Sequence, residues 1–194
     1  QRAKAALHAG ADLVVVNTCT VTSKAEQKAR RIFRLCLKKF PNAVILVTGC
    51  YAQLSKSEIE KIDSRIVVLG GQVKSRIKAL PDLMIENHNY EKSPDELCAI
   101  INKALDFPVQ KPGFPEDSFS LSTSSFLTHS RASLKIQDGC NNNCSFCAIH
   151  IARGHSVSIP AETAIQRVIE LEKAGQSEIV LTTVNIAQYK SEYN

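Results

Sequence analysis

The sequence lacks the features that would place the protein in a membrane or outside the cell. Its 194 residues include no tryptophan and one methionine, and no apolar run is long enough to cross a bilayer. No signal peptide precedes the first strand-like segment. We therefore expect no membrane partner. The apolar fraction of 44% and the charged fraction of 22% are those of a folded protein that buries a sizeable core.

Disulfide bonds are not expected either, although the chain has seven cysteines. Secreted disulfide frameworks are short and loop-rich, whereas this chain has an odd number of cysteines and regular helix and strand patterns. Thiols that bind a metal in a reducing cytoplasm are the better interpretation. The formal net charge of +5 is a mild basic excess, compatible with a nucleic-acid partner.

Residues 1–80 alternate between strand and helix patterns. The apolar, β-branched runs lie at 13–16, 43–47 and 65–69, and the helical patterns lie at 23–40, 55–62 and 71–80. The first two runs are continuous, which predicts strands buried on both faces. Ser23 followed by Glu26 is a capping-box pattern for the first helix. Strands and helices in alternation predict a parallel sheet with helices on its faces.

The chain changes character at residue 81. Five prolines and a serine-rich stretch in residues 81–130 predict a linker that holds one short helix at 95–105. Order returns in residues 131–194, with a strand at 132–136, an amphipathic helix at 163–174 ended by Gly175, and a strand at 178–181. This order predicts the start of a second α/β unit.

Three cysteines lie close together in the segment DGCNNNCSFCAIH. They are Cys140, Cys144 and Cys147, in the spacing C-x3-C-x2-C. The asparagines and the serine around them indicate a polar loop, which argues against buried free thiols. A zinc site needs four closed ligands, and His150 is a candidate for the fourth. A 4Fe-4S cluster held by three thiolates leaves one iron open to another ligand, which is typical of a catalytic site.

Two further cysteines follow predicted strands. Cys19 lies in NTCTVT after the first strand, and Cys50 lies in TGCYAQ after the second. Because the carboxyl ends of parallel strands form one edge of a sheet, these two thiols can face each other. Small buried hydrophobic side chains are the alternative, since cysteine is often buried. The cysteine loop favours a second iron–sulfur site.

The spacing C-x3-C-x2-C resembles the signature of radical S-adenosylmethionine (SAM) enzymes. The resemblance implies that the three cysteines hold a 4Fe-4S cluster whose fourth iron binds the amino and carboxylate groups of SAM. It also implies a reducing electron donor, cleavage of the sulfonium to a 5′-deoxyadenosyl radical, and a barrel that begins with the strand at 132–136. Phe146 matches an aromatic residue usual before the last cysteine, and Arg153 also fits the pattern. Both are expected near SAM.

NTCTVT and TGCYAQ resemble the amino-terminal domain of the methylthiotransferases, a family of radical SAM enzymes. This resemblance implies a second 4Fe-4S cluster held by Cys19 and Cys50, with its third cysteine upstream of this chain. Cys36 shares a helical face with apolar residues, and Cys98 matches nothing in the family. We expect both to be structural or incidental thiols.

The resemblances imply an α/β fold in two parts. A methylthiotransferase domain truncated at its start is expected at 1–80, a linker at 81–130, and the start of a radical SAM (β/α) barrel at 131–194. The chain begins with what looks like the end of a helix and stops soon after a strand. We therefore expect both ends to be cuts in a longer protein, and the chain alone to be inactive in methylthiolation.

Within the family, NTCTVT and KIQDGCNNNCSFC most resemble the branch that modifies threonylcarbamoyladenosine in tRNA. The implied reaction adds a methylthio group to C2 of N6-threonylcarbamoyladenosine at position 37. Related enzymes that act on isopentenyladenosine tRNA or on a ribosomal protein are alternatives, and a zinc-stabilised RNA-binding module is an alternative of another class. Three places depart from the family pattern, namely His150-Ile151, Ile159 and Thr183.

The helix predicted at 23–40 is strongly basic. Its acidic residue is Glu26, and its basic residues are Lys24, Lys28, Arg30, Arg31, Arg34, Lys38 and Lys39. A solvated helix face is the ordinary explanation of such a charge run. A contact with tRNA phosphates is the functional explanation.

Overall fold

The computed structural model describes residues 10–19, 22–86, 93–106, 108, 119 and 131–190. The chain forms two compact units, residues 1–109 and 110–194, and each has its own hydrophobic core. Of the helices described, none is both long and apolar enough to cross a membrane.

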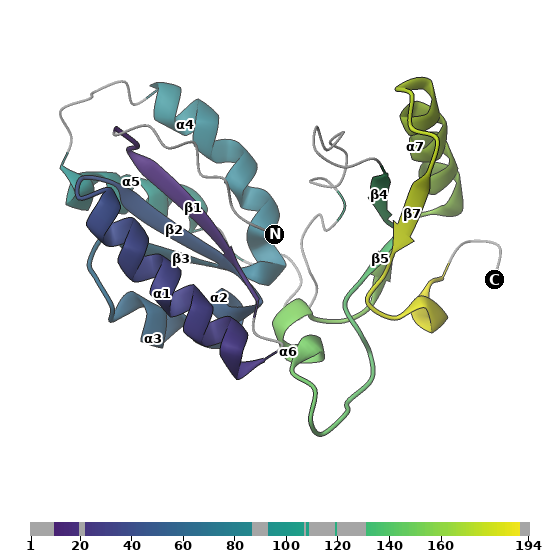
Figure 1. Ribbon diagram of the computed structural model, residues 1–194, viewed down its shortest axis with the longest axis horizontal. Helices are drawn as coiled ribbons and strands as arrows, with labels where there is room; N and C mark the ends of the chain where they lie inside the picture. The colour runs from purple at the N-terminus through teal and green to yellow at the C-terminus, as the bar shows by residue number, and fades with distance from the viewer. Residues whose placement is uncertain are drawn as a thin grey trace. The chain divides into compact units, whose positions relative to one another are not determined.

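The first unit is a parallel sheet with helices on both faces (Figure 1). Strands β1 (Leu13–Thr18), β2 (Val44–Gly49) and β3 (Ile66–Gly70) pair in that order. The helices are α1 (Ser23–Lys39), α2 (Cys50–Leu54), α3 (Lys56–Glu60), the 3-10 helix η1 (Gly71–Ala79), α4 (Leu80–Glu86) and α5 (Pro94–Leu105). The predicted α/β fold of this part is confirmed.

Strand β2 is the central strand of the sheet in the first unit, and all six of its residues are buried. On one face its Ile45 and Val47 belong to the same core cluster as Phe33 of α1. On the other face its Leu46 belongs to a cluster with Ile101 of α5. Successive side chains of a strand point to opposite faces, so a strand covered on both faces is apolar throughout. The continuous apolar run of β2 predicted this position.

Strand β1 differs from its prediction. It lies at an edge of the sheet, and its side chains alternate between buried and exposed, with Val15 45% exposed. The prediction of a strand buried on both faces is therefore wrong for β1. Valine is favoured in edge strands as well as in central strands, so a run of valines does not distinguish the two positions.

Helix α5 lies within the segment predicted as a linker, and it is part of the first core. Ser93 begins it with a capping box, in which the Ser93 amide donates to Glu96 Oε2 at 2.9 Å and the Glu96 amide donates to Ser93 Oγ at 3.3 Å. Its Ile101 and Leu105 are buried in the cluster on one face of the sheet. The folded part of the first unit thus extends beyond residue 80.

Both ends of α1 are held by side chains. The N-cap is Thr22, one residue before the predicted Ser23, and its Oγ1 accepts from the Ala25 amide at 3.2 Å. After the helix ends, Arg65 Nη1 donates to the carbonyl of Pro41 at 2.6 Å. Asp63 in turn holds the Arg65 guanidinium through two hydrogen bonds of 3.0 and 3.1 Å. This clamp fixes the turn from α1 into β2.

The second unit is built on a strand–helix–strand motif. Strand β4 (Ala132–Lys135) pairs in parallel with β7 (Ile179–Thr182), and the connection includes α7 (Ala161–Lys173). Gly175, with φ of 86°, follows α7 as predicted. The remaining elements are β5 (Gln137–Asp138), α6 (Ile149–Arg153), β6 (Val157–Ser158), which pairs antiparallel with β5, and the 3-10 helix η2 (Ile186–Gln188). The predicted second α/β unit is confirmed.

Replacing Asp63 by asparagine should destabilise the protein in a pH-dependent way. The hydrogen bonds from Arg65 hold the pKa of the Asp63 carboxyl below its ordinary value. A carboxyl with a lowered folded-state pKa stabilises the fold above its unfolded pKa, and this contribution is lost as the pH falls through the folded value. Asp63→Asn should therefore lower the free energy of unfolding by about 0.5–1 kcal/mol at neutral pH, and by progressively less as the pH falls below the ordinary carboxyl pKa.

Urea unfolding of both proteins at neutral and acid pH measures this difference. Asp106→Asn is the matched control, because Asp106 is exposed and should contribute little at either pH. A loss of equal size at both pH values would contradict the ionic role of Asp63.

Candidate functional site

The cysteine loop, residues 140–147, begins where β5 ends. Gly139 makes the turn with φ of 74°, and a Cβ atom at this position would collide with the backbone of His155. The next residue, Cys140, donates its amide to the Gly154 carbonyl at 3.0 Å. Glycine is needed because the two backbones approach so closely. This close approach fixes the place at which the first cysteine enters the loop.

Two asparagines of the loop are held by Gln188 of η2. The Asn141 amide donates to Gln188 Oε1 at 2.8 Å, and Gln188 Nε2 donates to Asn142 Oδ1 at 2.9 Å. Asn141 Oδ1 also accepts from the Ser156 amide at 2.9 Å. The polar residues that predicted a loop therefore join it to two other segments of the second unit.

Gln137 is fully buried and links the start of the cysteine loop to the segment after β7. Its Oε1 accepts from the amides of Val184 and Asn185 at 2.9 and 3.0 Å. Its Nε2 donates to the Gly139 carbonyl and to Ser156 Oγ, both at 2.8 Å. A buried amide must find partners for both of its ends, and here the partners lie on three different segments. Gln137 therefore sets the position of all three.

Asp138 is a buried anion beside the loop. Its Oδ2 accepts from Lys135 Nζ at 2.8 Å, and its Oδ1 accepts from Arg153 Nη1 at 3.0 Å and from the Gly139 amide at 2.9 Å. Burial raises the pKa of this carboxyl, but the two cations and their hydrogen bonds outweigh burial, so the pKa lies below its ordinary value. The carboxylate therefore stays charged at neutral pH and holds Arg153 at the base of the loop.

The three thiols of the loop are free, with Cys144 exposed and Cys140 and Cys147 half-buried. The Cys147 amide donates to the Cys144 carbonyl at 3.1 Å, which forms a turn between these residues. As placed, no three histidine, cysteine or carboxylate side chains among the described residues are close enough together to hold a metal ion. The thiols fit a cluster in type, number and accessibility, and exposed side chains change rotamer readily.

Other positions singled out in this unit have different surroundings. Phe146, in the loop, is 92% exposed. His150 lies on α6, and within the described part of the chain its buried Nδ1 has no hydrogen-bond partner. Ile159, one of the three departures from the expected pattern, is buried in the small core with Leu134 and Ile136. The zinc alternative needs His150 beside the three thiols. The described residues contain no preformed group of metal ligands for either zinc or a cluster, so the placement of His150 does not separate the two.

Cys19 and Cys50 follow directly after two neighbouring strands that end in register. Strands β1 and β2 are parallel, with Thr18 opposite Gly49, and the two cysteines follow these residues directly. Cys19 is exposed, and Cys50 is half-buried at the start of α2. Both lie at the carboxyl edge of the sheet, where parallel α/β folds bind ligands. The predicted placement at one edge agrees with this register.

Backbone packing explains why the two strand ends lie so close. Gly49 has φ of 99°, and a Cβ atom here would collide with the backbone of Thr18. Thr18 Oγ1 donates to the Thr48 carbonyl at 2.6 Å and accepts from the Ala52 amide at 3.3 Å. One hydroxyl thus ties the end of β1 to β2 and to α2.

The remaining two cysteines lie elsewhere in the first unit. Cys36 packs against the core cluster that contains Phe33, and burial raises the pKa of its thiol. Cys98 is buried in the other cluster, its Sγ lies 3.7 Å from the Ser64 carbonyl, and burial is again the main cause of a raised pKa. A thiol that stays protonated is a poor metal ligand, as expected for structural residues.

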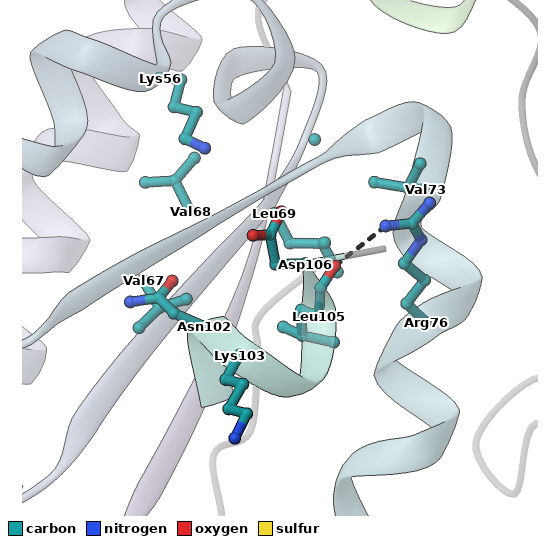
Figure 2. A pocket seen from close by; sticks show the side chains of 11 residues that line it. Lys56, Val67, Val68, Leu69, Val73, Arg76, Asn102, Lys103, Leu105 and Asp106 are labelled. Atoms are coloured by element: carbon teal, nitrogen blue, oxygen red, sulfur yellow. Dashed lines mark hydrogen bonds between the residues drawn. The ribbon is translucent and has the colours of Figure 1, made fainter. Parts of the chain in front are cut away.

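A pocket of about 430 Å³ lies beside β3 in the first unit (Figure 2). Among its lining residues is Arg76 of η1, which donates to the Leu105 carbonyl at 2.9 Å and so holds the end of α5. Lys56 and Lys103 also line it. No cysteine is among the lining residues, so this pocket is distinct from the cysteine sites.

Sequence reasoning missed the residues that hold the cysteine loop, above all Gln137, Asn185 and Gln188. Glutamine and asparagine are not typical metal ligands and follow no periodic pattern, so the sequence patterns assigned these three residues no individual role. The one usable signal was Gln137 itself, a polar residue that directly follows the apolar Ile136 at a predicted strand end.

Two family models match the chain. The Uncharacterized protein family UPF0004 matches residues 3–71, and the Radical SAM superfamily matches residues 134–193. The first match contains Cys19 and Cys50, and the second contains the whole cysteine loop.

Curated relatives align with nearly all of the chain. A threonylcarbamoyladenosine tRNA methylthiotransferase of Treponema pallidum is 40% identical over 92% of this chain and 46% of its own length. One from Bacillus subtilis is 37% identical over 92% of this chain and 36% of its own length. A tRNA-2-methylthio-N(6)-dimethylallyladenosine synthase of Ehrlichia canis is 30% identical over 94% of this chain and 39% of its own length. The chain thus spans less than half the length of each of these relatives.

Replacing Gln137 by leucine should loosen the cysteine loop. Leucine has a similar size but leaves the partly buried amides of Val184 and Asn185 without their acceptor, which costs at most about 1–3 kcal/mol for each group. We expect these two amides to exchange their hydrogens about tenfold faster or more. Hydrogen exchange measured by NMR tests this, with Gln166→Leu on the exposed side of α7 as the matched control. Unchanged exchange at both amides would show that Gln137 does not hold the loop.

Proposed function

We propose that the protein containing this chain adds a methylthio group to C2 of N6-threonylcarbamoyladenosine at position 37 of tRNA. The chain belongs to the radical SAM methylthiotransferase family, and the proposal follows from this membership. The observation that carries the proposal is the loop of three accessible thiols inside the segment matched by the Radical SAM superfamily. The relatives at 40% and 37% identity, which are named for threonylcarbamoyladenosine, support this choice of substrate.

Cys140, Cys144 and Cys147 would hold one 4Fe-4S cluster through their thiolates, and SAM would take the coordination position that three thiolates leave open. When bound, the cluster supplies the electron that cleaves the SAM sulfonium, so the protein also needs a reducing electron donor. The contribution of the chain is to orient the loop. Gln137 fixes its start, and Gln188 holds its asparagines.

Phe146 and Arg153 are proposed as neighbours of SAM. Phe146 is almost fully exposed within the loop, so its ring is free to cover a bound cofactor and exclude water. The Arg153 guanidinium is fixed by Asp138, two residues before the first cysteine. Its positive charge therefore lies at the base of the loop, where it favours an anionic group on the cofactor.

Cys19 and Cys50 would supply two thiolates of a second 4Fe-4S cluster, which would supply or carry the sulfur. Their level positions on adjacent parallel strands support this role. A third thiolate would come from another part of the protein. Because the substrate would be tRNA, we place the protein in the cytoplasm.

A second candidate substrate is dimethylallyladenosine in tRNA. The Ehrlichia canis relative, which is named for that modification, is 30% identical to this chain. The relatives named for threonylcarbamoyladenosine have higher identity, which favours the first substrate.

Replacing Cys144 by alanine should abolish assembly of the loop cluster. A 4Fe-4S cluster that keeps two of three thiolates is weakly held, so most of about four iron atoms per chain should be lost. The test is anaerobic reconstitution with iron and sulfide, followed by measurement of iron content and SAM cleavage. Because Cys144 is exposed, its replacement should leave the fold unchanged.

The matched control is Cys36→Ala, which removes a thiol from α1 and should leave iron content and SAM cleavage unchanged. Stoichiometric zinc in the wild-type chain, with no SAM cleavage, would favour the zinc-stabilised RNA-binding module. Full iron content and SAM cleavage in the Cys144→Ala protein would refute the assignment of this loop.

A further inference from the structure

Helix α1 has two faces of opposite character. Its inner face carries Ala29 and Phe33, which are 5% and 0% exposed and pack in a core cluster of the first unit. Its outer face carries exposed basic side chains, which we call the α1 cationic face; they are Lys24, Lys28, Arg31, Arg34 and Lys38. At about 100° per residue these five side chains fall within about one third of the helix circumference.

The other two basic residues of α1 have roles within the fold. Arg30 donates to Tyr51 Oη at 2.6 Å, and its guanidinium lies 5.7 Å from the centre of the Tyr51 ring. Lys39 Nζ lies 5.8 Å from the centre of the Phe40 ring. The structure thus separates Arg30, which is half-buried against Tyr51, and Lys39, which is exposed but lies beside the Phe40 ring, from the five residues of the α1 cationic face.

The α1 cationic face does not stabilise the helix that carries it. Its members stand three or four residues apart, so like charges are neighbours along the helix, and such pairs are unfavourable. The acidic residue of α1, Glu26, lies outside this face and is 3.9 Å from Arg30. Within the described part of the chain, no ion pair neutralises any of the five cations. Stability alone does not account for this arrangement.

The position of the face connects it with the cysteine edge of the sheet. Helix α1 starts four residues after Cys19, at the edge where Cys50 also lies, and then runs back along the sheet (Figure 1). Lys24 stands in its first turn, so the row of cations begins at this edge. From Lys24 to Lys38 the row extends about 21 Å, at about 1.5 Å per residue.

We propose that the α1 cationic face binds the phosphate backbone of the RNA substrate and guides it toward the edge that carries Cys19 and Cys50. The proposal rests on the proposed function, in that it takes RNA as the substrate. The row of about 21 Å presents five cations along one line, and each phosphate that such a cation neutralises releases counterions and so favours binding. The exposed apolar residue on this side of the helix is Leu35, so the face offers charge without the apolar centre typical of protein partners.

The test is the salt dependence of RNA binding by the chain. The variant combines Lys28→Gln, Arg31→Gln and Lys38→Gln, and the probe is an unmodified tRNA anticodon stem–loop. The slope of log affinity against log salt should fall by about 0.7–0.9 for each phosphate that is no longer neutralised, or about 2–3 in total. The matched control, Lys56→Gln with Lys61→Gln and Lys103→Gln, removes three exposed cations from other helices and loops of the same unit. It should leave the slope unchanged.

A second variant separates charge from shape. Lys28→Arg, Arg31→Lys and Lys38→Arg keep the charge and should retain the salt slope of the wild type. No variant should have a much lower thermal midpoint than the wild type, since the changed residues are exposed, and loss of like charges on α1 should raise the midpoint slightly.

Three outcomes would overturn the proposal. In the first, the α1 variant and the control lose the same amount of salt slope, and in the second, the slope changes in neither. In the third, the α1 variant loses binding to anionic vesicles but keeps its binding to RNA. Iron content after reconstitution is measured on the same samples and depends on the loop cysteines. A failure of the α1 surface is thereby distinguished from a failure of the proposed function.

Discussion

Parallel pairing makes neighbouring strands end at one edge of a sheet, and the arrangement of the cysteines depends on this constraint. In the first unit the register of β1 and β2 brings Cys19 and Cys50 out at one level. In the second unit the Ile136 amide donates to the Thr182 carbonyl at 3.0 Å, so β4 and β7 also end together. The cysteine loop and the segment after β7 therefore start from the same edge, and Gln137 connects them there. In each unit the cysteines thus lie at the carboxyl ends of strands, where α/β folds commonly bind ligands.

Within the second unit, buried polar groups fix the arrangement of the segments more than apolar packing does. Its described core cluster has three buried residues, Leu134, Ile136 and Ile159. Beside it lie Gln137 and Asp138, which are buried and hydrogen-bonded at both ends of their side chains. Apolar contacts are non-directional, whereas a satisfied polar network specifies one arrangement of its partners. A loop that must present three thiols in one geometry needs this kind of support.

The sequence predicted the features that arise from periodicity and spacing. The strand–helix alternation, the end of α7 at Gly175 and the level positions of Cys19 and Cys50 all agree with the structure. Long-range contacts were not predictable in this way. The edge position of β1, which leaves Val15 exposed, depends on the elements that pack beside the strand and not on the strand itself. The role of Gln137 likewise depends on amides 47 and 48 residues later in the chain.

The cationic residues of α1 show the same division between local and long-range information. All seven look alike in sequence, but Arg30 is distinguished by a tyrosine 21 residues away. The remaining outer residues begin beside an exposed thiol, Cys19. An exposed thiol is open to oxidation, and a cluster held there would need shielding from solvent. A phosphate backbone bound along α1 would cover this edge while the substrate is present, so charge recognition and protection of the thiol would result from the same contact.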